Sequence, residues 1–388
     1  MNHGMSIGLP LLLLAIRALG AIGALGVNDA GAHHSTAVFT MDKVVELRGV
    51  VVDFKLRSPH SSFVIDARTF ADGQQGASVE RWEIESEALP VLRTMGIDTN
   101  TFKPGDAVRI MASPHRDARF KFAHAQVLVA ADGKEYGFAS TNRVFSPSLR
   151  ALGGAGAQAP ATAAAAPSAV GVQRLAGRWQ APLPIYAPNG ESPLPLNEAG
   201  LAARRAYDRK ASPANTCEPM TVPDVYSAPF YLLDVRLTDA QAVLHHEAYD
   251  IQRTVPLSGT PAAADPRGWF GRVSGRIDGD VLIVDSSGYA ASKWGLGAEV
   301  QPMGNGADVP SSAQKEVRER YSVSDDGSTL TVEYTIIDPV YLTAPYTSRV
   351  ELTRVPEGTQ MYPYDCDVES AGMWSRTVGE KPLRVGAE

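Results

Sequence analysis

Cysteine is nearly absent from this chain: among 388 residues there are two, Cys217 and Cys366. Basic runs are also missing, and the formal net charge of −7 excludes the strongly basic surface typical of nucleic-acid binders. The sequence contains no paired metal-binding cysteines, no nucleotide-binding motif and no nucleophile elbow in a strand-to-helix setting. We therefore expect no nucleic-acid partner, and no reaction type is indicated by a motif.

The N-terminus predicts export. Residues 8–16 form an apolar core, and Ala30-Gly31-Ala32 has the small-x-small pattern of a cleavage site. We predict that residues 1–32 are a signal peptide and that the mature protein begins at His33, is periplasmic or secreted and has no stable membrane anchor. An uncleaved anchor is the alternative.

Export has a consequence for the two cysteines. In an oxidising compartment, Cys217 and Cys366 are expected to form a disulfide within the second half of the chain. Two buried thiols are the alternative.

Composition divides the rest of the chain into two domains. Residues 146–173 are rich in Ala, Gly, Pro and Ser and bury too little apolar surface to offset their ordering entropy, which predicts a linker. We therefore expect one domain over residues 33–145 and a second over 174–388.

The first domain reads as short strands separated by turns. Apolar and β-branched runs cover residues 44–52, 63–65, 82–84, 107–110 and 125–129, and a short helix is expected at 86–95. This pattern predicts a small Greek-key barrel of the oligomer-binding type.

Four short motifs carry a resemblance in this region. In chain order they are His33-His34-Ser35, Arg57-Ser58-Pro59-His60, Trp82-Glu83-Ile84-Glu85 and Lys103-Pro104-Gly105-Asp106. Together they resemble a family of uncharacterised small exported bacterial proteins, which typically has Asn-Pro-His where this chain has Ser58-Pro59-His60. The resemblance covers roughly residues 33–138 and implies fold and compartment only.

The second domain is organised around a hairpin at residues 268–289, with an Asp278-Gly279 turn between apolar runs. Val281 to Val284 are apolar at consecutive positions, so both faces of that strand are expected to be buried. Residues 330–336 alternate between apolar and polar after a second turn at Asp326-Gly327. Successive hairpins of this kind predict an antiparallel meander that closes into a barrel.

Two motifs in this half resemble exported lipocalin-like β-barrel proteins of uncharacterised function: the Gly-x-Trp at residues 177–179 and the Gly-rich strand pair at 271–285. In such barrels the Trp closes one end of the cup. The predicted fold class is therefore all-β: a small oligomer-binding-like Greek-key barrel followed by a larger lipocalin-like antiparallel barrel.

Four histidines are candidate metal ligands. An N-terminal His33, followed by His34, offers its amine and imidazole together, and His60 or His115 could complete a site suited to copper. A solvated N-terminus and two polar turn histidines are the alternative. No cofactor is otherwise indicated.

A histidine pair marks a candidate acid–base site. Strand alternation is expected to place His245 and Glu247 on one face and His246 on the other, so that one of them faces the barrel interior. Together with Asp285, these residues are the candidates for an isomerase, lyase or hydrolase. Surface cross-strand pairing is the alternative.

Aromatic residues are concentrated in the second half. They fill a barrel core or line the site of one small apolar ligand, and Arg253 could bind a carboxylate or form a surface salt bridge. The candidate ligand-binding residues are Trp179, Tyr249, Arg253, Trp269, Tyr289, Trp294, Tyr334 and Tyr341. The preferred function is binding of a small hydrophobic molecule in the second barrel, and an enzyme acting on such a molecule is the alternative.

Overall fold

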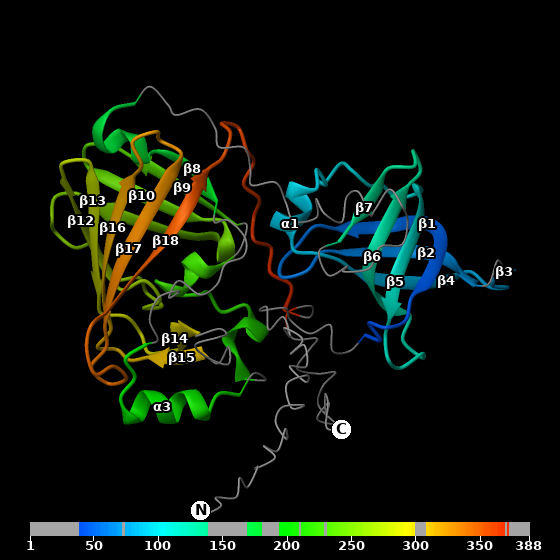
Figure 1. Cartoon of the computed structure of the whole chain (residues 1–388), viewed down its shortest axis with the longest axis horizontal. Coiled ribbons are helices and arrows are strands. Elements are labelled where there is room, and N and C mark those ends of the chain that lie inside the picture. The colour runs from blue at the N-terminus through cyan, green and yellow to red at the C-terminus, as the bar shows by residue number, and fades with distance from the viewer. Residues whose placement is uncertain are drawn as a thin grey trace, which may run out of the picture.

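The computed structural model describes residues 39–71, 74–138, 169–180, 194–208, 211–228, 231–298, 308–368 and 371. Within these ranges the chain forms two β-barrels that lie side by side (Figure 1). The predicted signal peptide lies outside the described residues, as does the predicted linker up to residue 168. The last linker positions, 171–173, belong to the 3-10 helix η2 (Gly171–Leu175). No helix among the described residues is long and apolar enough to cross a membrane.

The first barrel is a ring of five strands, and hydrogen bonds between β1 and β2 close it. Its order is β1-β5-β6-β4-β2, and every pair is antiparallel except β4–β6. The strands are β1 (Val45–Lys55), β2 (Ser62–Ala71), β4 (Glu80–Glu85), β5 (Ala107–Pro114) and β6 (Phe122–Ala130), with β3 (Gln74–Gln75) and β7 (Glu135–Gly137) as short additions. The helix expected at 86–95 is α1 (Leu89–Thr94).

Aromatic packing fills the first barrel. Phe54 and Phe63 stack with ring centroids 4.4 Å apart, and Phe102 packs edge-on against both rings. Tyr136 adds a further edge contact to Phe102 at 5.7 Å. Such pairs contribute roughly 0.5–1.5 kcal/mol each beyond the area they bury.

The second barrel contains nine antiparallel strands in the order β11-β10-β9-β8-β18-β17-β16-β13-β12. Because β11 also approaches β12, the sheet is nearly closed. Its strands are β8 (Gly177–Gln180), β9 (Leu232–Leu237), β10 (Gln241–His246), β11 (Ile251–Pro256), β12 (Arg272–Asp278), β13 (Val281–Ser287), β16 (Glu316–Val323), β17 (Thr329–Ile337) and β18 (Tyr346–Arg354). The all-β prediction with two barrels is confirmed.

Smaller elements lie outside the nine-stranded sheet. Strands β14 (Ser292–Ala298) and β15 (Asp308–Ser311) pair with each other, and α3 (Glu198–Arg205) begins where the Asn197 side chain accepts a hydrogen bond from Gly200 N. The 3-10 helices η4 (Pro213–Thr216), η5 (Asp224–Ser227) and η6 (Ala248–Asp250) lie in the connections.

The organising hairpin is β12–β13, with its turn one residue later than predicted. Asp278 pairs with Val281, so the two-residue turn is Gly279-Asp280, and Gly279 supplies the positive φ of 60° that a two-residue hairpin turn favours. Leu282 and Val284 join the barrel core, while Ile283 is buried on the opposite face. The expectation that this strand is covered on both sides is confirmed.

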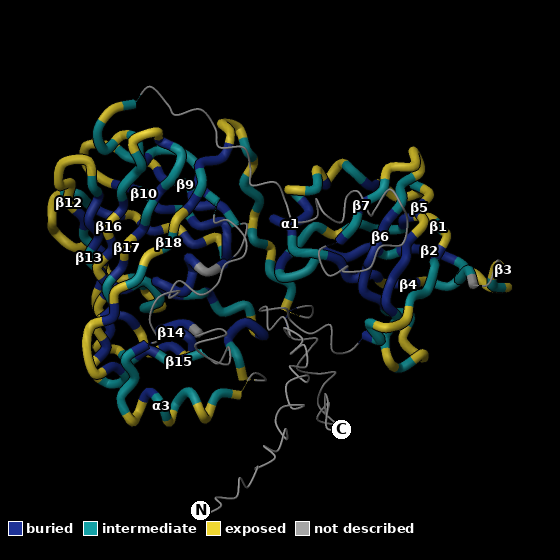
Figure 2. The backbone as a smooth tube through the Cα atoms, viewed as in Figure 1, coloured by how far each residue is buried: buried dark blue, intermediate teal, exposed yellow. Residues whose placement is uncertain are grey.

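Two features join the C-terminal end of the chain to the barrels. Cys217 and Cys366 form the predicted disulfide across a sequence separation of 149 residues. Residues 356–368, which we term the strap, run from the end of β18 through the space between the two barrels (Figure 1). Buried positions concentrate in the barrel strands, whereas every strap residue is exposed or half-buried (Figure 2).

Candidate functional site

A charged pair lies inside the second barrel. The side chains of Arg253 on β11 and Glu319 on β16 are 0% exposed. Arg253 Nη1 donates to Glu319 Oε1 at 3.0 Å, and Nη2 donates to Glu319 Oε2 and to Ser286 Oγ. Arg253 is thus a core residue rather than the surface salt bridge considered from the sequence, and the carboxylate it binds bidentately is the protein's own.

Two tyrosines complete this network. Tyr321, two residues beyond Glu319 on the same face of β16, donates to Glu319 Oε1 at 2.7 Å. Tyr226 of η5 donates to the same oxygen, and its hydroxyl also contacts that of Tyr321. Burial, reinforced by the charge of Glu319, raises the pKa of both phenols well above the usual value. Both therefore remain protonated donors at neutral pH.

Glu319 is held in its charged form. Burial acts to raise the pKa of Glu319, but the charge of Arg253 and the hydrogen bonds from Arg253, Tyr226 and Tyr321 outweigh burial and lower it. Such a buried pair is costly to form, and removing one partner typically destabilises a protein by about 3–5 kcal/mol because the other charge is left uncompensated.

His246 lies beside this network and lines a small cavity. Its ring is edge-on to Tyr226 with centroids 5.2 Å apart, and within the described residues its buried Nε2 has no hydrogen-bond partner. Burial, with the charges of Arg253 and His245, lowers the pKa of His246 to about 3, so the imidazole is neutral at physiological pH.

The cavity itself is small and mainly apolar. Its volume is about 10 Å³, which is room for about one water molecule. The lining residues are Val225, Tyr226, Ala228, Tyr231, Leu232, Leu233, His246, Ala248 and Leu352. The rest of the barrel interior is packed with side chains of one continuous core.

A buried lysine fastens the connections beside the barrel. Lys315 is 0% exposed, and its Nζ donates to Thr221 Oγ1, Val222 O and Gly295 O at 2.9–3.0 Å. The Nζ also lies 4.2 Å from the ring centroid of Tyr289. Burial lowers the pKa of Lys315 to about 7.

The structure does not bring the predicted acid–base residues together. His245 is on the outer face and lies 2.7 Å from Asp250, while Asp285 pairs on the barrel exterior with Arg276 and Arg318. The predicted alternation through Glu247 is wrong, because β10 ends at His246 and Glu247 has helical dihedrals.

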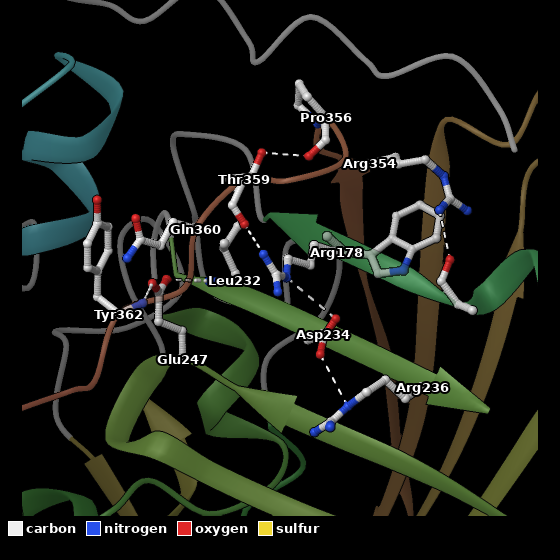
Figure 3. A network of polar contacts seen from close by, with 12 residues as sticks. Arg178, Leu232, Asp234, Arg236, Glu247, Arg354, Pro356, Thr359, Gln360 and Tyr362 are labelled. Carbon is white, nitrogen blue, oxygen red and sulfur yellow. Dashed lines mark hydrogen bonds and ion pairs between the residues drawn. The ribbon is translucent and has the colours of Figure 1, made fainter. Parts of the chain in front are cut away.

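Glu247 instead joins the two barrels. It is 1% exposed and accepts hydrogen bonds from Arg93 of α1 at 2.5 and 3.0 Å and from Leu232 N at 3.0 Å. Tyr362 N of the strap donates to Glu247 Oε1 at 2.9 Å. Figure 3 shows Glu247 between Leu232 and the strap residues.

The predicted aromatic residues separate into three groups. Tyr289 and Tyr334 are in the barrel core. Trp179 is also in the core, where its Nε1 donates to Leu175 O and the Arg354 guanidinium lies 3.9 Å from its ring centroid.

Tyr249 and Trp294 lie at the strap side. Tyr249 stacks on Tyr364 with centroids 4.4 Å apart and contacts Trp294 edge-on at 6.0 Å. The third group, Trp269 and Tyr341, is half-buried at the periphery. Neither Arg253 nor any of these aromatic candidates lines the cavity.

The predicted copper ligands are not assembled within the described residues. His33 and His34 lie outside these residues. His115 packs against Phe39 and Phe120, whereas His60 Nδ1 lies 3.3 Å from Ser86 O. No group of three or more His, Cys, Asp or Glu side chains in the described ranges could hold a metal ion. Copper binding by the mature N-terminus stays a prediction.

Three important residues, Glu319, Tyr226 and Lys315, were missed from the sequence. Glu319 had a signal: in β16 it alternates with Val317 and Tyr321, which places a carboxylate on an apolar face. Lys315, directly before β16, continues this alternation on the buried face. Tyr226 comes from a connection with no periodicity, so nothing local marked it.

Comparison with known proteins adds one match. The model of a family of unknown function (DUF6152) matches residues 23–122, which cover most of the first barrel. This agrees with the resemblance of the N-terminal half to an uncharacterised family. No curated protein and no solved structure matches the chain.

Proposed function

We propose that the second barrel binds a small, uncharged, mainly apolar molecule at the cavity beside His246. The observation that carries the proposal is a buried imidazole nitrogen that has no hydrogen-bond partner among the described residues, set in an otherwise largely apolar lining. Ligand sites typically combine such a lining with a few polar groups that fix orientation.

The charges at the site support an uncharged ligand. Arg253 and Glu319 neutralise each other, and His246 is neutral because its pKa is lowered to about 3. None of the described lining residues offers a charged ligand a counter-charge, and burying such a ligand unpaired is costly. A hydroxyl or carbonyl group on an apolar skeleton suits one neutral imidazole.

Binding anything larger than a water molecule requires the cavity to widen. Known ligand pockets measure about 300–1,000 Å³, far above the volume of this cavity. The residues that line the cavity come partly from η5 and its flanks, which belong to a connection rather than to the sheet. We therefore place the necessary movement there. We also propose that the second barrel is a lipocalin-like barrel.

A fluorescence titration tests it. N-phenylnaphthylamine, an uncharged apolar probe, is expected to bind the wild-type protein with micromolar affinity and increased emission. Ala228→Leu fills the cavity and should weaken binding by about tenfold. Ala214→Leu is the matched control, because Ala214 has the same 8% exposure but does not line the cavity. Equal affinities for the two variants would contradict the assignment.

An enzyme acting on the same ligand is the second candidate, since a histidine and a carboxylate–tyrosine network adjoin one cavity. An imidazole with a pKa of about 3 is a weak base, and Glu319 is fully engaged, so this arrangement favours binding over acid–base catalysis. We also propose export, because the Cys217–Cys366 disulfide is typical of an oxidising compartment.

A further inference from the structure

The strap contacts both barrels but is buried in neither. From Pro356 to Val368 each residue is exposed or half-buried. Segments with few buried contacts open at low free energy, independently of the core that they cover. The strap therefore depends on a small number of specific attachments.

On the second barrel these attachments surround the cavity. Residues on both sides of Ala248, which lines the cavity, hold the strap: Glu247 accepts from Tyr362 N, and Tyr249 stacks on Tyr364. Tyr231, also a lining residue, packs against Tyr364 with centroids 5.5 Å apart. The strap thus lies over the end of the barrel that contains the cavity.

The first barrel clasps the same segment from the other side. Ser58 N donates to Asp365 O at 3.4 Å, and Asp367 N donates to Ser58 O at 2.9 Å, so the strap pairs with the β1–β2 connection as a short parallel bridge. Arg57 forms an ion pair with Asp367 at 2.5 Å. The Ser58 hydroxyl also lies 3.2 Å from the Tyr231 hydroxyl, which joins the first barrel directly to the cavity wall.

We infer that the strap, fastened by the Cys217–Cys366 disulfide and clasped by the first barrel, is the gate of the cavity in the second barrel. Cys366 lies between Asp365 and Asp367, the two residues that pair with Ser58, so the disulfide fixes the strap where the first barrel holds it. As a gate the strap rests on the proposed function, but its position over Ala248 is testable without any ligand.

Thiol accessibility in the full chain provides that test. Ala248→Cys places a thiol in the cavity wall, and its alkylation by iodoacetamide is compared in the wild-type background and in the Cys217→Ser/Cys366→Ser background. We expect release of the strap to raise the alkylation rate by about tenfold or more. The control is Ala242→Cys, near the start of β10 and 0% exposed. Its rate should rise much less than the rate at position 248, because only global unfolding of the barrel exposes it.

Two outcomes would contradict the inference that the strap is a gate. One is an unchanged rate at position 248 after the disulfide is removed. The other is an equal rise at positions 242 and 248, which would indicate general unfolding. If the double serine background does not fold, Arg57→Gln with the disulfide intact gives the same comparison with a smaller expected rise.

The probe then separates the two proposals. Faster entry of N-phenylnaphthylamine into the disulfide-free protein supports both. Faster alkylation without any probe binding would refute the proposed function and leave the strap as a cover of the barrel end. Binding at an unchanged rate, with faster alkylation, would refute the gate alone.

Discussion

The two barrels differ in where they place charge. Among the described residues, one buried Asp, Glu, Lys or Arg belongs to the first barrel, Glu85, whereas the second domain buries seven: Asp224, Glu247, Arg253, Lys315, Glu319, Asp338 and Arg354. The core of the first barrel is apolar and centred on stacked phenylalanines, as in a domain whose interior serves packing alone. The second retains costly groups inside, which indicates a role beyond stability or a need for one arrangement of its connections.

We expect the largest loss of stability when the charged pair of the second barrel is broken. Arg253→Met leaves Glu319 buried and uncompensated, so we expect a loss of about 3–5 kcal/mol in the free energy of unfolding. Replacing both residues by Met should recover most of this loss, because no isolated charge remains. Urea denaturation followed by intrinsic fluorescence measures both. A double variant as unstable as the single one would show that the network contributes more than charge compensation.

Loss of the disulfide should have the next largest effect. In the chain-entropy model a loop of this length contributes roughly 5 kcal/mol, and measured values are typically about 2–4 kcal/mol. We expect Cys217→Ser/Cys366→Ser to lower the unfolding free energy of the second barrel by about 2–4 kcal/mol. The unfolding transition of the first barrel should change little. Separate urea transitions, assigned with probes in each barrel, check this. Equal destabilisation of both would mean that the strap couples their unfolding.

The titration of Lys315 should give a smaller effect, a change of stability with pH. Because folding lowers the pKa of Lys315 from 10.5 to about 7, the unfolded chain binds more protons between these values, and stability should rise with pH there. The slope is at most about 1.4 kcal/mol per pH unit. Above pH 10 the buried tyrosines, such as Tyr289 with a pKa raised to about 12, act in the opposite direction. Lys315→Met should remove the rise between pH 7.5 and about 9.5, which thermal melts would detect.

The smallest effect is expected on the barrel exterior. Asp285→Asn breaks pairs with Arg276 and Arg318 whose side chains are half-exposed or more. Surface pairs of this kind contribute about 0–1 kcal/mol, so stability and probe affinity should change little. A tenfold loss of probe binding on this substitution would return Asp285 to the candidate site.

Strand positions were readable from the sequence where alternation and turn residues agree. Residues 330–336 and the Asp326-Gly327 turn predicted β17 and its hairpin, and the apolar run after Gly279 predicted a strand covered on both faces. These signals are local, because each face of a strand responds to its own environment.

The site was not readable in the same way, since it depends on chain reversals without the usual residues. The strand β10 ends where Glu247 adopts helical dihedrals, and Tyr249 and Asp250 then reverse the chain with positive φ values of 57° and 51°, although neither is Gly or Asn. That reversal turns Glu247 toward Arg93 and leaves His246 as the last inward position of β10. Contacts such as Tyr226 with Glu319 join residues that are 93 apart in the sequence, and no local pattern encodes them.

A ligand bound inside the second barrel is expected to contact His246. Nitrogen NMR of ¹⁵N-labelled imidazoles tests it directly, with His246→Phe used to assign the signal. Our account predicts a neutral ring down to about pH 4 and a shift of its nitrogen resonances when N-phenylnaphthylamine is added. Probe fluorescence that rises while the His246 resonances stay unchanged would place binding elsewhere and contradict the account.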